Sequence, residues 1–162
     1  MLKNGIYFAK PELYELIREC GGVWNDNKQR PIVCILESKE CKGLYYAIPL
    51  GVYNHRDDNA KQRIHSYISL PSNRIESCYY HLGKTTVQSI FFISDVVPII
   101  DKYIDREYLS LYSKQHFLIK NKILLKELER KLLRILSFEN SKPNHFRQHI
   151  TDVKNKLIEE LK

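Results

Sequence analysis

The spacing of the apolar residues changes near residue 101, and this change limits the folds open to the chain. Before it, apolar and β-branched residues come in short runs such as 30–36 and 44–50, which are typical of β-strands. After it, apolar residues follow the 3-4-3 spacing of one helix face, at Leu125, Leu128, Leu132 and Ile135. A β-rich region followed by a helical region predicts an α+β fold.

Local signals place the remaining elements. Pro11 begins a short N-terminal helix and Gly21-Gly22 ends it. After residue 101 we expect two helices, separated by a break at 140–143, with the last one running from about 144 to 161. About five short strands are expected, at 30–36, 44–50, 63–70, 87–93 and 96–100. Short strands joined by hairpins predict a small, strongly bent antiparallel barrel.

The length of 162 residues fits one domain over 1–162, with a β-rich core at about 28–100 and a helical tail at about 101–162. No apolar run reaches the roughly 20 residues that a membrane helix needs, and residues 1–5 lack the apolar part of a secretion signal. The four cysteines contain no C-x-x-C pair, so we expect no metal site and a reducing, cytoplasmic location.

The charge of the chain points to a polyanionic partner. There are 26 Lys and Arg against 19 Asp and Glu, which gives a net charge of +7. Residues 101–162 hold 14 of the basic and 9 of the acidic residues, so most of the excess lies there. A small basic protein favours nucleic acid over a membrane surface as its partner. A solvated helix rich in lysine explains the same composition equally well.

Two segments at expected strand ends carry groups suited to RNA chemistry. His55 and Arg56 follow the strand at 44–50 and offer a proton carrier and a phosphate-binding fork. Lys84, Thr86 and Ser89 offer a cation and hydroxyls at the entrance to the strand at 87–93. Metal-free RNA cleavage needs a base for the 2′-OH, cations for the charged phosphorane and an acid for the leaving 5′-oxygen. The alternative is that both segments are ordinary exposed turns.

Further basic and aromatic residues are candidates for RNA binding. Arg30 and Tyr53 flank the strands described above. On the expected helix, four basic residues recur every four positions and form a basic stripe, at Lys122, Lys126, Arg130 and Arg134. Such a stripe spans about 18 Å and suits successive phosphates, whereas the alternative is a solvated face that keeps the protein soluble.

Four short motifs in this order resemble the ToxN/AbiQ and CptN toxins of type III toxin–antitoxin systems, and more distantly the MazF/PemK/Kid ribonuclease toxins. The motifs are 30–33 (RPIV), 46–50 (YAIPL), 83–87 (GKTTV) and 95–99 (DVVPI). The resemblance covers roughly residues 30–105, and in a general way the helical tail as well. It implies a compact, SH3-like antiparallel β-barrel with an N-terminal helix and C-terminal helices.

The resemblance also implies an activity and partners. These toxins are sequence-selective endoribonucleases of phage defence that need no metal or other cofactor and leave a 2′,3′-cyclic phosphate. A repeated, folded antitoxin RNA holds them inactive, in a higher-order protein–RNA assembly. ToxN-like chains have Thr-Ser-x-x-Lys after the Pro-Leu, where this chain has 51–56 (GVYNHR). The resemblance implies that His55 acts as general acid or base and that Arg56 replaces the lysine of Thr-Ser-x-x-Lys. Lys84 and Thr86 match the family's motif at 83–87.

Two other functions remain open on the residues alone. A non-catalytic RNA-binding protein would use the basic stripe and some of the eleven tyrosines as stacking surfaces. An adaptor protein would use its C-terminal helices to dock a partner.

Overall fold

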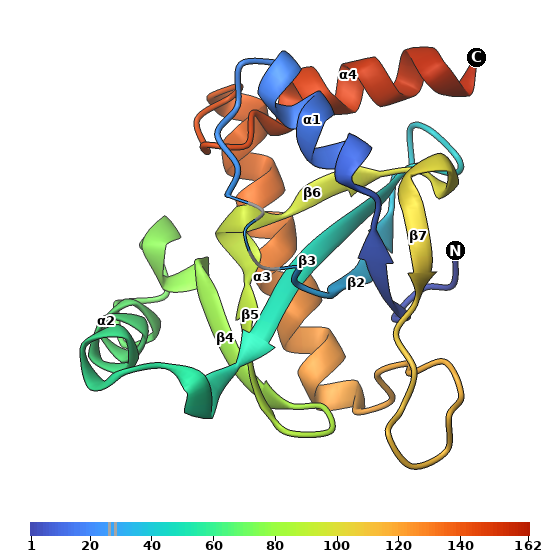
Figure 1. The fold of residues 1–162 in the computed structure, drawn as a ribbon. Helices are drawn as coiled ribbons and strands as arrows, with labels where there is room; N and C mark the ends of the chain where they lie inside the picture. The colour runs from blue at the N-terminus through green and yellow to red at the C-terminus, as the bar shows by residue number, and fades with distance from the viewer. Residues whose placement is uncertain (26, 28) are drawn as a thin grey trace.

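The computed structural model describes residues 1–25, 27 and 29–162, so the expected start of the β-rich core at residue 28 lies outside it. The fold is α+β, as the sequence predicts (Figure 1). The helices are α1 (Pro11–Glu19), α2 (Asp58–Ile68), α3 (Lys122–Ser141) and α4 (Ile150–Leu161). The strands are β1 (Ile6–Ala9), β2 (Ile32–Glu37), β3 (Tyr45–Val52), β4 (Tyr80–Lys84), β5 (Gln88–Phe92), β6 (Val97–Ile99) and β7 (Ile104–Glu107).

All strand pairs are antiparallel and run in the order β4-β5-β3-β2-β1-β7, while β6 pairs with β3. The long strand β3 organises this sheet, because its first residues pair with β6 and its last residues pair with β5. A register shift in β2 between Cys34 and Leu36 marks an irregularity in the β2–β3 ladder. Within the described residues these ladders form an open path, so a closed barrel stays a prediction.

Helices cover both faces of the sheet, which explains why the β2 segment is apolar at successive positions. Val33 and Ile35 belong to a cluster with the buried face of α3, whereas Ile32 and Cys34 belong to a second cluster with α1 and α4. Figure 1 shows α3 running behind the sheet and α2 standing beside β4. The expected apolar face of α3 is confirmed, since Leu128, Leu132 and Ile135 are fully buried.

The strand expected at 63–70 is wrong, because α2 occupies residues Asp58–Ile68. The Asp57 side chain begins this helix by accepting a hydrogen bond from the Ala60 amide at 2.8 Å. Ala60, Ile64 and Ile68 recur every four residues and line one side of the helix. A short window that begins at residue 63 hides this helical period.

The expected helical tail at 101–121 is also wrong. This segment contains β7, which pairs with β1, followed by isolated bridges from Leu118 to Gly5 and from His116 to Leu109. Strands β1, β4 and β7 were not expected. The last helix begins at Ile150 rather than at 144. Asn144 and His149 adopt positive φ angles of 59° and 53°, which a continuous right-handed helix excludes.

None of the helices in the described residues has both the length and the apolar character that a membrane crossing requires.

Candidate functional site

A basic cavity of about 630 Å³ lies beside β5, on the sheet face opposite α3. Phe91 packs toward α3, so the neighbouring Phe92 side chain points to the other face. We call this cavity the arginine pocket. It is lined by Asn25, Asn27, Arg30, Arg56, Arg63, Tyr80, Phe92, Ser94, Asp95 and Arg147.

Two half-buried arginines share the Phe92 ring. The guanidinium carbon of Arg30 lies 4.8 Å from the ring centroid and that of Arg56 lies 5.2 Å from it. Gly51 makes this approach possible, because a Cβ there would lie 2.8 Å from Arg30 Nη1 and 3.1 Å from Arg56 Nη2. Arg30 and Arg56 therefore need a glycine at the end of β3 to sit side by side.

Within the described part of the chain, these arginines form none of the ion pairs that usually accompany buried cations. Burial lowers the pKa of Arg30 and the neighbouring Arg56 charge lowers it further, whereas the Asp95 charge raises it. Asp95 is already engaged, since Arg147 Nε and Nη2 donate to its two oxygens at 3.1 and 3.0 Å. Among the described residues no carboxylate forms an ion pair with Arg30, Arg56 or Arg63. The described lining of the pocket therefore holds four arginines against one aspartate, an excess of positive charge.

One donor in the arginine pocket has no partner at all. The Nε atom of Arg56 is buried and forms no hydrogen bond within the described structure. An unpaired buried donor on a cation costs free energy, and in this conformation Nε has no exposed surface through which a ligand could reach it.

The residues expected next to Arg56 take different positions. His55 lies in the short 3-10 turn Tyr53–His55 and is exposed, directly before Arg56. The Tyr53 hydroxyl is hydrogen-bonded to Nε2 of His65 at 2.8 Å, and the Lys61 ammonium lies 5.0 Å from its ring. Tyr53 thus ties the 3-10 turn to α2, and its ring faces a cation of the protein.

The hairpin between β4 and β5 holds Lys84, Thr86 and Ser89, and it reaches the same end of the sheet as the end of β3. Ser89 pairs with Val52 across β3 and β5. Its side chain is buried and its hydroxyl lies 2.9 Å from the Thr85 hydroxyl while donating to the Val87 carbonyl at 3.0 Å. Ser89 therefore stabilises the turn.

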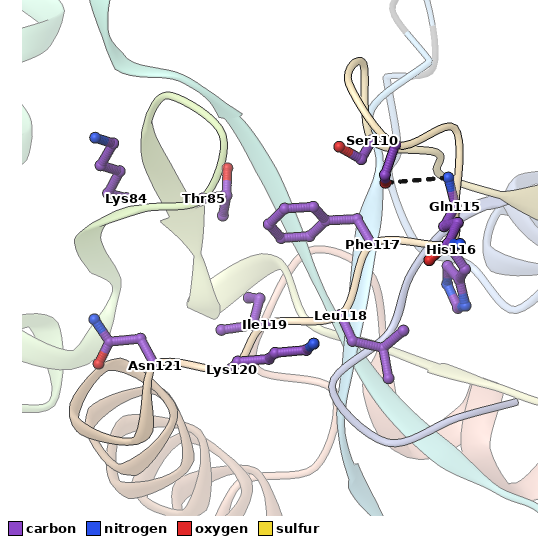
Figure 2. A pocket seen from close by; sticks show the side chains of 11 residues that line it. Lys84, Thr85, Ser110, Gln115, His116, Phe117, Leu118, Ile119, Lys120 and Asn121 are labelled. Carbon is purple, nitrogen blue, oxygen red and sulfur yellow. Dashed lines mark hydrogen bonds between the residues drawn. The ribbon is translucent and has the colours of Figure 1, made fainter.

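Lys84 is exposed and lines a different cavity, shown in Figure 2. The structure does not bring Lys84 and Arg56 into one pocket. Thr86 lies half-buried in the turn between the two strands.

The basic stripe on α3 divides into two parts. Lys122 and Lys126 are exposed at the start of the helix. Arg130 Nη2 forms an ion pair with Glu127 at 2.8 Å, and Arg134 donates to the carbonyl oxygens of Ser72 and Asn73. As far as the described residues go, Lys122 and Lys126 can thus contact an external anion without exchanging a partner.

Several residues at these sites were not expected from the sequence. Arg63, Tyr80, Phe92 and Arg147 reach the arginine pocket from four separate segments, and no spacing in the sequence connects them. On the α3 side, burial lowers the pKa of His81 to about 4, with a further contribution from the Lys131 charge. Lys131 is itself buried and donates to the Tyr80 carbonyl at 2.8 Å.

Throughout the described ranges, no three His, Cys, Asp or Glu side chains are grouped as a metal site would require.

No protein-family model matches the chain, and no curated protein matches it by sequence. A solved structure matches over almost its full length. That structure is AbiQ, described as a lactococcal anti-phage endoribonuclease belonging to the type III toxin–antitoxin system. The match has a TM-score of 0.60 and covers 97% of this chain and 94% of AbiQ, at 16% sequence identity.

The chain has the fold of AbiQ. The likeness extends beyond residues 30–105, where the sequence motifs lie, and includes the N-terminal strand and the C-terminal helices. At 16% identity the likeness concerns the fold, so the comparison assigns no role to individual residues.

Proposed function

We propose that this protein is an endoribonuclease toxin of a type III toxin–antitoxin system, acting in the cytoplasm as a single domain over residues 1–162. The observation that carries the proposal is the arginine pocket, found in a chain with the AbiQ fold. A phosphodiester is the anion that fits this pocket best, because arginine forks bind phosphate oxygens in pairs and Phe92 and Tyr80 offer flat surfaces beside them.

The reaction we propose is cleavage by the neighbouring 2′-OH of the RNA. The 2′-oxygen forms a bond to phosphorus and loses its proton, while the bond from phosphorus to the 5′-oxygen breaks and that oxygen gains a proton. The products are a 2′,3′-cyclic phosphate and a free 5′-OH, and no metal takes part. Arg30 and Arg56 stabilise the extra negative charge on the phosphorane.

His55 is our candidate for one of the two proton transfers, because it directly precedes Arg56 and is open to solvent. Lys84, Thr86 and Ser89 remain candidates from the sequence motif. Ser89 supports the turn that presents the other two.

The test is incubation of the purified protein with a mixed cellular RNA in the presence of EDTA. We expect cleavage at a limited set of sites, with fragments that carry a 2′,3′-cyclic phosphate end. Cleavage that stops in EDTA and returns with magnesium would contradict the metal-free mechanism. Intact RNA under all conditions would contradict the proposed activity.

We further propose that a folded, repeated RNA inhibits the toxin in a protein–RNA assembly. Tandem repeats of about 35–50 nucleotides directly upstream of the coding region are the expected genetic sign of such a system by family resemblance. The protein expressed together with that DNA is expected to co-purify with an RNA of repeat length and to lose its toxicity.

A second candidate function is RNA binding without cleavage. The exposed Lys122 and Lys126 at the start of α3 favour it, since they can contact phosphates without giving up a partner. A His55→Ala variant separates the two functions. If the protein is an endoribonuclease, the variant loses cleavage and keeps RNA binding. If it only binds RNA, wild type and variant bind equally well and neither cleaves.

A further inference from the structure

A second cavity lies between the β4–β5 hairpin and the extended segment before α3 (Figure 2). Its volume is about 410 Å³, which is in the range of pockets that hold small organic ligands. We call it the lysine pocket. It is lined by Lys84, Thr85, Ser110, Ser113, Gln115, His116, Phe117, Leu118, Ile119, Lys120 and Asn121.

The lining of the lysine pocket combines positive charge with neutral hydrogen-bonding groups. Lys84 and Lys120 are both exposed, and no Asp or Glu occurs among the described residues that line the cavity. Gln115 and Ser113 add amide and hydroxyl groups. In Figure 2, Lys84 lies at the rim with its ammonium directed away from Phe117. Exposed cations beside exposed amide and hydroxyl groups suit a ligand that carries both a phosphate and a polar ring.

The pocket also has an aromatic wall. The Phe117 side chain extends into the space between the two segments and faces Thr85 (Figure 2). Tyr112, which lies in the chain between the lining residues Ser110 and Ser113, is 92% exposed, and Leu111 beside it is 69% exposed. Aromatic side chains so fully exposed are typical of surfaces on which nucleic-acid bases stack.

We propose that the lysine pocket binds one unstacked nucleotide of a single-stranded RNA segment, at a place separate from the arginine pocket. Phe117 or Tyr112 contacts the flat face of the base, Gln115 contacts its edge, and Lys84 and Lys120 bind the flanking phosphates. A single strand fits because bases splayed out of a helix expose both the face and the edge that these groups contact, whereas a duplex hides them. This inference rests on the proposed action on RNA and adds a nucleotide contact outside the arginine pocket, beside the candidate residue Lys84.

The test compares two double variants of equal charge. Lys84→Ala/Lys120→Ala removes the cations of the lysine pocket. Lys39→Ala/Lys42→Ala removes two exposed lysines from the β2–β3 connection, at the opposite end of β3. Binding of a fluorescent single-stranded RNA, long enough to reach both pockets, is measured by anisotropy at several salt concentrations. Gln115→Ala, whose side chain is exposed, tests the base contact without a change of charge.

We expect the Lys84/Lys120 variant to bind RNA at least fivefold more weakly and to lower the salt slope by about one to two, since each lost phosphate contact on a single strand lowers it by about 0.7. The Lys39/Lys42 variant is expected to keep both values. A 4-thiouridine in the RNA is expected to cross-link to the peptide that contains residues 111–117.

Equal effects of the two double variants, or cross-links confined to other peptides, would overturn this inference and leave the proposed cleavage intact. A wild-type protein that neither binds nor cleaves RNA would instead overturn the proposed function, and the inference with it. Binding of duplex RNA as tight as single-stranded RNA would show that the pocket holds no unstacked base.

Discussion

The arginine pocket and the basic stripe on α3 contain the same kinds of residue but differ in what those residues contact. In the arginine pocket, Arg30 and Arg56 share an aromatic ring, and within the described structure neither forms an ion pair with a carboxylate, because Asp95 is paired with Arg147. In the stripe, Arg130 is paired with Glu127 and Arg134 holds two backbone carbonyls of the turn before β4.

The difference teaches that a count of positive charges does not locate an anion site. A cation that already has partners must exchange them for the ligand, and the net gain is small. A half-buried cation without a partner forms hydrogen bonds to the ligand without first losing others. The stripe has the more regular pattern in the sequence, yet the arginine pocket has the stronger physical case for binding phosphate.

The largest expected effect is at Arg56. Arg56→Ala should lower the RNA cleavage rate by about 100-fold or more, because it removes charge stabilisation in the transition state. Arg56→Lys keeps the charge but loses the planar fork, so an intermediate rate is expected. The measurement is cleavage of a defined RNA under single-turnover conditions.

Arg106 provides the matched control for Arg56. Its guanidinium also stacks on a ring, 4.3 Å from the Phe8 centroid, but it is paired with Asp105 at 2.5 Å. Arg106→Ala should cleave RNA at close to the wild-type rate. If Arg56→Ala and Arg106→Ala lower the cleavage rate equally, an arginine without an ion-pair partner has no special role in the reaction.

The next largest effect is expected at Arg134, which we expect to stabilise the fold rather than to bind RNA. Arg134→Gln should lower the free energy of unfolding by about 1 kcal/mol, because the Ser72 and Asn73 carbonyls lose their donor. Urea denaturation measures this loss, and Lys126→Gln on the same helix is the control. If Arg134→Gln lowers RNA affinity and leaves the free energy of unfolding unchanged, Arg134 binds RNA and our expectation is wrong.

A pH effect of similar or smaller size is expected on the α3 side, at His81. Burial lowers the pKa of His81 to about 4 in the folded protein, against 6.5 for the unperturbed side chain. The unfolded chain therefore binds a proton that the folded protein excludes, and stability falls as the pH drops from about 6.5 to 4. Partial exposure of the side chain limits the loss to about 1 kcal/mol.

Denaturation of wild type and His81→Asn at pH 7 and pH 4.5 checks this dependence. The variant should lose less stability on acidification than the wild type. The exposed His145 provides a control, since His145→Asn should follow the wild-type curve. Parallel curves for all three proteins would show that His81 does not titrate differently on folding.

The smallest effect is expected within the stripe. Replacing Lys122, Lys126, Arg130 and Arg134 together by Gln should lower the antitoxin-RNA affinity a few-fold and reduce the salt slope by about two. Replacing Lys122 and Lys126 alone should give nearly the same reduction, because the other two side chains have partners. An unchanged affinity and slope in the four-site variant would identify the stripe as ordinary surface.

The sequence was sufficient for the α+β class, the N-terminal helix, four of the seven strands and the inward face of α3, because each depends on local hydrophobic spacing. It was not sufficient for β1, β4 and β7. β1 and β7 are short and pair with each other across nearly 100 residues of sequence, while β1 also pairs with β2. The pattern around Ile64 was misread because its period becomes visible only when Asp57 is recognised as the start of a helix.

The same division applies to the candidate site. The sequence by itself determined that Arg56 follows an apolar strand and that the chain carries excess positive charge. Only the tertiary structure decided which charges are available. Arg30 and Arg56 meet on Phe92 because β3 and β5 pair, and Arg147 removes Asp95 from them, whereas the chain turn at 72–73 occupies Arg134. Binding capacity depends on the partners that a side chain finds in space, and the linear order of residues does not specify those partners.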